Sequence, residues 1–458
     1  MQDTKQNLAS IEYSLNDDDI VYFLHIPKTA GTTLIAILDS YFDFDSIYPW
    51  RFWPKLLRKI PDFTKYKLVR GHFGYGLHRL LPKKPVYVTI LRDPIERTIS
   101  DYDHRVRDPD PLYKEKYSKN QSIAEFFSDK EKRKTFENMH TLHIGLDPDI
   151  LLLTKSYGRK SIHRFRFREE LPYWADDVSK KELLETAKQR LANFEFVGIA
   201  EKFEESLFLL YYTFGWRPIS STWRLNIAKK RPRSEELPSE AVAKIRECVQ
   251  LDIELYNYAK QLFEQRYSRM VHDLKTKYYK DSYASLSPTE MMYKMLEKHY
   301  ESRLDCTHYT LVTTLDYDFR PKLSGSGWYY REVLEETGET FRWTGPHTVS
   351  TIDFPLVKEN DLVVKVSVMR AIAPDIMDSL KLKVNNHPIK LERSSYNHGR
   401  ATFEGVIPKS ALAGEKPFTR LVFEINRTIN PHEINPTDPT NRFLGVAINR
   451  IKIVPKPS

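Results

Sequence analysis

The chain has very few cysteines, only Cys248 and Cys306 among 458 residues. A disulfide framework and a cysteine-rich metal site are therefore both excluded. No apolar run approaches the roughly 20 residues that a membrane-spanning helix needs. Residues 1–7 are polar and lack the apolar core of a secretory signal, so we expect a protein of the cytoplasm.

The excess of one charge is moderate. There are 71 lysines and arginines against 62 aspartates and glutamates, which leaves a net charge of +9. A basic surplus suits a polyanionic partner. The basic residues are dispersed, however, and no recognised nucleic-acid-binding module is present, so we do not expect nucleic acid to be that partner. The length suits two to three domains with sizeable cores.

An apolar run at Val21–Leu24 is followed by the segment His25–Thr33, which reads H-I-P-K-T-A-G-T-T. This pattern predicts a buried strand, a tight loop with one lysine, and a helix that begins at Gly31. A helix N-terminus favours an anion, Lys28 adds a full charge, and a glycine allows close approach of the backbone. Further hydroxyl donors come from Thr29, Thr32 and Thr33. The segment therefore predicts a phosphate-binding loop.

The loop differs from that of nucleotide-binding P-loop proteins. Their motif is G-x-x-x-x-G-K-[ST], in which the lysine follows the last glycine. Here Lys28 lies three residues before Gly31, and no recognisable Mg²⁺-binding carboxylate motif accompanies the loop. A P-loop kinase is therefore the weaker interpretation, and we expect no metal.

The loop resembles the 5′-phosphosulfate loop of sulfotransferases, and most nearly that of the carbohydrate group with heparan sulfate 2-O- and 6-O-sulfotransferases and their bacterial relatives. A β-rich run at Val86–Leu91 is followed by R-D-P at 92–94 and S-D-Y at 100–102, similar to the family's 3′-phosphate site. The segments F-E-F-V-G at 194–198 and N-I-A-K-K-R at 226–231 follow in the family's order. The resemblance spans about residues 20–270.

The resemblance implies a P-loop-like sulfotransferase fold of the α/β class with a mainly parallel sheet. It implies 3′-phosphoadenosine 5′-phosphosulfate as co-substrate, with Lys28 neutralising the leaving phosphate. In the family's pattern, Arg92 and Ser100 hold the 3′-phosphate. Lys230 and Arg231 lie in the basic segment that closes over the 3′-phosphate and the acceptor.

A general base must take the proton of the acceptor hydroxyl, and His72 is the candidate. Histidine has the unperturbed pKa best suited to accepting a proton near neutral pH. In the family, a histidine in a G-H segment between the two phosphate sites is the base, and here that segment is Gly71-His72. Whether His25, His78 or His140 contributes is open. It is also open whether Arg97 binds phosphate or pairs with a neighbouring aspartate.

Alternating β-rich runs and amphipathic helical patterns predict an α/β domain over residues 1–270. Within it, a long helix is expected at Glu235–Arg266. Residues 271–305 form a helical connector with a helix start at Pro288.

Short alternating runs take over at about residue 306 and predict an all-β sandwich, jelly-roll-like, over 306–458. The pair Asn385-Asn386 between two such runs predicts a hairpin. The aromatic clusters around Trp328 and Trp343 could stack on sugars, although aromatic residues at strand spacing more often belong to a core. No catalytic motif is recognised in this domain.

The sequence therefore indicates a carbohydrate sulfotransferase of bacterial type, acting on a hydroxyl of a polysaccharide. Animal members of the family carry an N-terminal membrane anchor, and we expect none here. Two alternatives stay open: a catalytically inactive glycan-binding or scaffold protein, and a sulfotransferase for a small-molecule or lipid-linked alcohol. The acceptor sugar and the oligomeric state are not defined by these patterns.

Overall fold

The structure, a computed structural model, describes residues 11–109, 113–114, 117, 121–149, 167–219, 232–304, 310–438 and 440–457. By their contacts these residues form two units. Of the described residues, unit 1 takes those within Met1–Ile35, Ser46–Gly215 and Leu225–Ala284, and unit 2 takes those within Ala36–Asp45, Trp216–Arg224 and Ser285–Ser458. The domain boundaries near residues 270 and 306 stay a prediction.

Unit 1 is built on a four-stranded sheet that is parallel throughout, in the order β2-β1-β3-β4. The strands are β1 (Val21–Leu24), β2 (Leu68–Gly71), β3 (Val86–Leu91) and β4 (Phe196–Ile199). Every residue in them is buried, as expected for parallel strands that are covered on both faces. The expected α/β fold with a mainly parallel sheet is confirmed.

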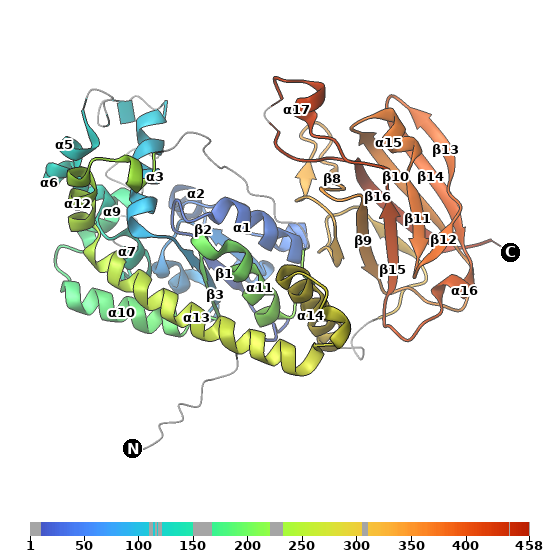
Figure 1. Cartoon of the computed structure of the whole chain (residues 1–458), viewed down its shortest axis with the longest axis horizontal. Coiled ribbons are helices and arrows are strands. Elements are labelled where there is room, and N and C mark those ends of the chain that lie inside the picture. Colours follow the sequence, from blue (N-terminus) through green and yellow to red (C-terminus); the bar gives the residue numbers. More distant parts are fainter. Residues whose placement is uncertain are drawn as a thin grey trace, which may run out of the picture. The chain divides into compact units, whose positions relative to one another are not determined.

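Helices lie around this sheet (Figure 1). In chain order they are α1 (Gly31–Leu38), α2 (Trp53–Arg58), α3 (Pro94–Arg107), α5 (Ile123–Ser128), α6 (Lys130–Arg133), α7 (Met139–Gly145), α9 (Phe167–Trp174), α10 (Lys180–Ala192), α11 (Phe203–Phe214), α12 (Ser239–Cys248) and α13 (Gln250–Tyr278). The helix α11 and the long helix α13 both pack against β4. Cys248 is buried at the end of α12.

The prediction of one helix over 235–266 is wrong, because the chain breaks between α12 and α13 at Val249. The break is stabilised by a reciprocal pair of caps. The Asn138 side chain accepts hydrogen bonds from the N–H groups of Leu251 and Asp252 at 2.9 and 3.3 Å. In return, the Asp252 carboxylate accepts the N–H groups of His140 and Thr141 at the start of α7. Helical spacing within one segment carries no sign of such a distant cap.

Unit 2 contains two antiparallel sheets. The first has the order β13-β14-β10-β16-β8-β7, with β5 also on β16, and the second has the order β12-β11-β15-β9-β6. The strands are β5 (Leu315–Tyr317), β6 (Gly325–Ser326), β7 (Glu332–Val333), β8 (Thr340–Trp343), β9 (Val349–Phe354), β10 (Leu362–Ala371), β11 (Lys381–Val384), β12 (His387–Ile389), β13 (Glu392–Asn397), β14 (Arg400–Ile407), β15 (Thr419–Glu424) and β16 (Val446–Pro455). The helices are α14 (Pro288–Arg303), α15 (Pro374–Asp378), α16 (Lys409–Leu412) and α17 (Pro431–Ile434).

The two sheets share one apolar core, to which β10, β14 and β16 contribute from the first sheet and β9, β11 and β15 from the second. The predicted hairpin is confirmed, because β11 and β12 pair across Asn385 and Asn386, which have φ values of 46° and 73°. The helix start at Pro288 is also confirmed, with a capping box between Ser287 and Glu290.

The aromatic clusters of unit 2 belong to its interior. Trp328, Tyr329 and Trp343 are 1%, 2% and 4% exposed. The Trp328 ring packs against Phe319 and Phe423, and its Nε1–H donates to the Thr351 carbonyl at 2.9 Å. These rings are therefore core residues, and they offer no sugar-stacking face.

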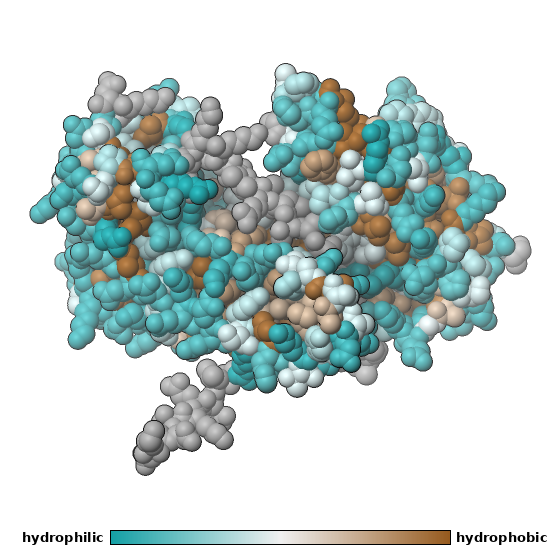
Figure 2. All heavy atoms as spheres, viewed as in Figure 1, coloured by the Kyte–Doolittle hydropathy of each residue, from teal (hydrophilic) through white to brown (hydrophobic). Residues whose placement is uncertain are grey.

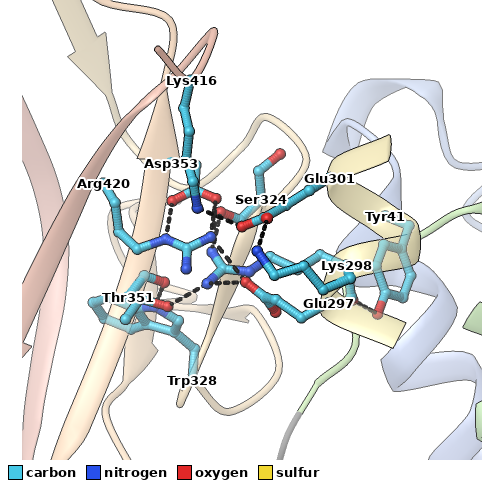
Figure 3. Close-up of polar contacts among 11 residues, drawn as sticks. Tyr41, Glu297, Lys298, Glu301, Ser324, Trp328, Thr351, Asp353, Lys416 and Arg420 are labelled. Atoms are coloured by element: carbon cyan, nitrogen blue, oxygen red, sulfur yellow. Dashed lines mark hydrogen bonds and ion pairs between the residues drawn. The ribbon is translucent and has the colours of Figure 1, made fainter. Parts of the chain in front are cut away.

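A charged network ties strand β9 to two segments that precede the β region (Figure 3). The Asp353 side chain, 1% exposed, binds Arg420 on the neighbouring strand at 2.8 Å and Arg217 at 3.0 Å. Glu297 on α14 binds the same two arginines at 2.9 and 3.2 Å. The strands of unit 2 are thus held partly by residues that lie outside 306–458.

We expect Asp353→Asn to lower the free energy of unfolding by about 2 kcal/mol, because the buried Arg217 and the partly buried Arg420 both lose a charged hydrogen-bond partner. Chemical denaturation of the full chain, followed by circular dichroism, measures the change. The matched control is Glu424→Gln on the neighbouring strand β15, since Glu424 pairs with Lys383 where both side chains are partly exposed. That control should change stability by less than about 1 kcal/mol. Equal effects of the two substitutions would show that the buried network does not stabilise unit 2.

Candidate active site

The predicted site residues of unit 1 follow the carboxyl ends of neighbouring parallel strands. The register pairs Leu24 of β1 with Gly71 of β2, and Leu91 of β3 with Ile199 of β4. From β1 the chain goes to β2 on one side and later to β3 on the other. The side on which new strands join the sheet therefore reverses, and the switch point lies between β1 and β3. In open α/β sheets, ligands bind beyond the carboxyl ends of the strands at this point of reversal.

The loop after β1 has an unusual backbone. Lys28 and Ala30 have φ values of 72° and 64°, in the left-handed region that residues other than glycine rarely adopt. Left-handed residues in a short loop are a feature of backbone nests, which hold anions. Lys28 is half-buried, and α1 begins directly after the loop.

The threonines of this loop differ in their surroundings. Thr29 is fully buried, and its hydroxyl donates to the Ile26 carbonyl at 2.9 Å, so its side chain holds the turn. Thr33 is 3% exposed, whereas Thr32 is half-buried in the first turn of α1. Thr32 is therefore better placed than Thr29 to donate its hydroxyl to a ligand.

Gly31 is required for a reason that the sequence did not suggest. A Cβ atom at this position would lie 1.9 Å from Nε2 of His25. The ring of His25 therefore fills the space beside the start of α1. A side chain of the protein itself thus gives a second reason for the glycine, besides the close approach of a ligand that the motif predicts.

His72 lies directly after β2 and is bound to the loop after β1. Its Nδ1 is 2.8 Å from the His25 carbonyl oxygen. A carbonyl oxygen only accepts, so Nδ1 carries the proton, and in the neutral ring Nε2 is then the proton acceptor. The His72 N–H also donates to the Arg51 carbonyl at 2.9 Å. His72 thus has a fixed tautomer and a fixed backbone, as a general base requires.

His25 supports this arrangement. It is 7% exposed, and its ring lies 4.3 Å from that of His72 and 5.2 Å from that of Phe23, measured between ring centroids. Burial, and then the nearby charges of His72 and Arg51, hold the pKa of His25 well below its ordinary value. The buried His25 therefore positions the base and is less suited than His72 to take up the acceptor's proton.

Arg92 lies directly after β3 and reaches the same loop. Its Nη1 donates to the Lys28 carbonyl at 3.0 Å, across the switch point between β1 and β3. Glu96 and Glu201 lie 3.7 and 4.0 Å from the guanidinium, too far for hydrogen bonds. Glu201 also accepts the Asp93 N–H and the Tyr256 hydroxyl, so it joins the ends of β3 and β4 to α13.

The other predicted residues of the phosphate sites lie on α3 or outside the described part of the chain. Ser100 is half-buried on α3, the helix that follows Arg92. Arg97 is fully buried on the same helix and pairs with Asp101 at 3.7 Å, which favours the structural interpretation of that residue. Lys230 and Arg231 lie outside the described residues.

His140 and His143 on α7 are fully buried. Burial, with a further contribution from Arg97, holds the pKa of His140 well below its ordinary value. Burial lowers the pKa of His143 to about 3. His78, the other candidate base, lies near Asp147 with its Nε2 3.1 Å from the carboxylate. His72 is therefore the histidine whose surroundings best suit proton transfer.

Within the described ranges, no group of three or more histidine, cysteine, aspartate or glutamate side chains is arranged to hold a metal ion. In the same part of the chain, no helix combines the length and the apolar character that crossing a membrane requires.

A family model described as the sulfotransferase family matches residues 12–259, which include the whole parallel sheet and every site residue described above. The chain belongs to the sulfotransferase family.

Several curated relatives are similar to this chain. Heparan-sulfate 6-O-sulfotransferase 2 of Danio rerio is 26% identical over 58% of this chain and 62% of its own length. The Homo sapiens protein of that name is 26% identical over 57% of this chain and 47% of its own. Heparan-sulfate 6-O-sulfotransferase 1 of Cricetulus griseus is 24% identical over 56% of this chain and 70% of its own. The chain thus spans less than two thirds of the first two of these relatives.

Among solved structures, a GH115 4-O-methyl-α-glucuronidase, BtGH115A, matches 95% of this chain and 51% of its own, with 10% identity and a TM-score of 0.20. That likeness is too weak to support any statement about fold or function.

Two parts of the site were not predicted as such. Glu201 appears in the F-E-F-V-G…E-K-F segment, but nothing in that pattern shows that it joins Asp93, at the end of β3, to Tyr256 of α13. Arg51, whose backbone holds His72, lies between two aromatic residues, Trp50 and Phe52. That run of aromatic and basic residues before β2 was a visible signal.

Proposed function

We propose that this protein is an enzyme that transfers a sulfuryl group from 3′-phosphoadenosine 5′-phosphosulfate to a hydroxyl of a carbohydrate. The proposed acceptor is a polysaccharide. One observation supports this activity most. The short loop His25–Lys28 accepts hydrogen bonds through two of its carbonyls, one from His72 and one from Arg92. A candidate base and a candidate phosphate ligand are therefore both fixed to the loop that carries the candidate cation.

The residues present fit the donor nucleotide. Lys28 and the N-terminus of α1 provide positive charge for the 5′-phosphosulfate. Arg92 provides a planar guanidinium for the 3′-phosphate, with the Ser100 hydroxyl two turns along α3. Thr32 and Thr33 add hydroxyl groups in the first turn of α1. Lys230 and Arg231 complete this set as the sequence predicts it.

The donor supplies the sulfuryl group and a phosphate leaving group. Nε2 of His72 accepts the proton of the acceptor hydroxyl as the oxygen forms its bond to sulfur. The sulfur–oxygen bond to the phosphate breaks, and Lys28 neutralises the charge that develops on the phosphate oxygen. The Nδ1–H of His72 keeps its bond to the His25 carbonyl, which stabilises the imidazolium that forms.

The acceptor is proposed from two facts. The relatives are named heparan-sulfate 6-O-sulfotransferases, and the net charge of +9 suits an acidic polysaccharide. Incubation with sulfur-labelled donor and a panel of polysaccharides tests the reaction. Labelling of a lipid-linked or small alcohol alone would select the second alternative. Donor binding without transfer to any acceptor would favour the inactive binding protein.

Other predictions from the sequence are kept as part of this proposal. They are a cytoplasmic location, a bacterial source, a P-loop-like core in unit 1 and a jelly-roll-like β-sandwich in unit 2. The core shared by the two antiparallel sheets supports the sandwich. We propose no particular oligomeric state.

We expect Arg92→Ala to weaken binding of 3′-phosphoadenosine 5′-phosphate by about 2 kcal/mol or more, the scale for loss of a charged hydrogen bond. Calorimetry without Mg²⁺ measures it.

The control ligand is adenosine 5′-phosphate, which lacks the 3′-phosphate. If Arg92 binds the 3′-phosphate, the substitution should hardly change affinity for this control. Arg92 also bonds to the Lys28 carbonyl, so a purely loop-shaping role would weaken both ligands equally. Equal losses would remove Arg92 from the 3′-phosphate site.

A further inference from the structure

The face of the protein in Figure 2 is mostly hydrophilic, although some of the described large apolar side chains are exposed. Two of these lie close together in unit 1, on the segment that leads into α2. Trp50 is 47% exposed and Phe52 is 55% exposed. Between them lies Arg51, the residue whose carbonyl accepts the His72 N–H. Two exposed aromatic rings thus flank a residue that holds the candidate base.

This segment is held rigidly. Trp53 is fully buried, packs edge-on against Phe73 at 5.5 Å, and donates its Nε1–H to the Phe73 carbonyl at 3.0 Å. A Cβ atom at Gly71 would lie 2.5 Å from the Arg51 carbonyl oxygen, so the two backbones are in close contact. The exposed rings are therefore attached to the same rigid unit as His72.

The exposed rings also lie near the chemistry and near positive charge. The Phe52 ring centroid is 5.3 Å from that of His72. The Lys55 ammonium lies over the Trp50 ring, 4.8 Å from its centroid. A sugar ring has an apolar C–H face that stacks on an aromatic ring, and an acidic sugar adds a charge for an ammonium to bind.

We propose that Trp50, Phe52 and Lys55 form an acceptor subsite that takes a sugar ring bearing a carboxylate or sulfate group, beside the sugar whose hydroxyl reacts at His72. This rests on the proposed function and adds the chemistry of the acceptor to it. The charge argues for this occupant over an apolar protein partner. A lysine placed over the exposed ring would be desolvated by such a partner, at a cost that an anionic sugar avoids.

The test uses heparosan, a polymer of alternating glucuronate and N-acetylglucosamine, with neutral dextran as the uncharged probe. The variants are Trp50→Ala, Phe52→Ala, Lys55→Ala and the conservative Lys55→Arg. We expect each alanine variant to raise the KM for heparosan by about three- to tenfold, with kcat and the affinity for 3′-phosphoadenosine 5′-phosphate nearly unchanged. Lys55→Arg should restore most of the affinity.

Tyr279→Ala is the matched control, because Tyr279 is 45% exposed and belongs to unit 1. It follows α13, about 33 Å along the helix axis from Tyr256, which binds Glu201 near the site. This control should change neither constant.

Direct binding separates this proposal from the proposed function. Retardation of each variant on a heparosan gel, without donor, is measured alongside sulfate transfer. Suppose that the wild type transfers no sulfate but is retarded on the gel, and that the Trp50 and Phe52 variants are not retarded. The proposed function then fails and the subsite stands. Unchanged retardation and KM in all variants would overturn the subsite. So would equal loss on dextran, or a change of oligomeric state with glycan binding intact, which would mark the patch as a contact between copies.

Discussion

His72→Asn should lower turnover by roughly 100-fold or more while leaving donor binding intact. The substitution removes Nε2, the atom that accepts the proton, but the asparagine amide can still donate to the His25 carbonyl. Labelled transfer to a polysaccharide measures turnover, and calorimetry with 3′-phosphoadenosine 5′-phosphate measures binding. In the wild type, turnover should also fall as the pH is lowered, because an imidazolium cannot accept a proton. The variant should lose that acid limb.

His78→Ala is the control for this prediction. His78 is the alternative base, but its Nε2 lies 3.1 Å from the Asp147 carboxylate. Its removal should leave turnover within a few-fold of the wild type. Near-normal turnover in His72→Asn, together with a large loss in His78→Ala, would reverse the two assignments.

Much of this site was predictable because its residues lie in local sequence patterns. A buried apolar run followed by P-K-T-A-G-T-T specifies a strand, a loop and a helix, and the structure has β1, the loop and α1 at those positions. Arg92 follows a second such run, and His72 follows a third. Parallel strands place their carboxyl ends together, so residues that follow such runs lie at one edge of the sheet although they are far apart in sequence.

The remainder depended on contacts between distant segments. The role of Gly31 arises from the ring of His25, six residues earlier but folded back over the helix start. The break between α12 and α13 depends on Asn138, more than one hundred residues away in sequence. Trp328 became a core residue because it packs into the apolar cluster that the two sheets of unit 2 share. None of these contacts has a local pattern, so periodicity and motifs could not reveal them.

Contacts between distant segments also connect the residues of the site through one loop. His72 and Arg92 come from different strands, yet each is anchored to a carbonyl of residues 25–28. A change in the backbone of this loop would therefore displace the base and the phosphate ligand together. Lys28, whose carbonyl accepts the Arg92 hydrogen bond, has a left-handed conformation in this loop.

Lys28→Met should lower turnover by about 100- to 1,000-fold, the scale for loss of one group that stabilises the developing charge in a transition state. Methionine keeps most of the aliphatic stem and removes the ammonium, so the loop should keep its packing. Affinity for 3′-phosphoadenosine 5′-phosphate should fall much less, because the charge on the leaving phosphate develops during the reaction. Steady-state kinetics with labelled donor and calorimetry measure the two effects.

Lys28→Gly is the matched control, since φ at this position is 72° and glycine adopts that conformation without strain. Both variants lack the ammonium, but only the glycine variant relieves the backbone. If the charge is what matters, the two should lose turnover equally, although the glycine variant is at least as stable to denaturation. If the role of Lys28 is to shape the loop, the glycine variant should retain far more activity than the methionine variant. Turnover within tenfold of the wild type in Lys28→Met would remove Lys28 from the chemistry and leave α1 and Arg92 to neutralise the leaving group.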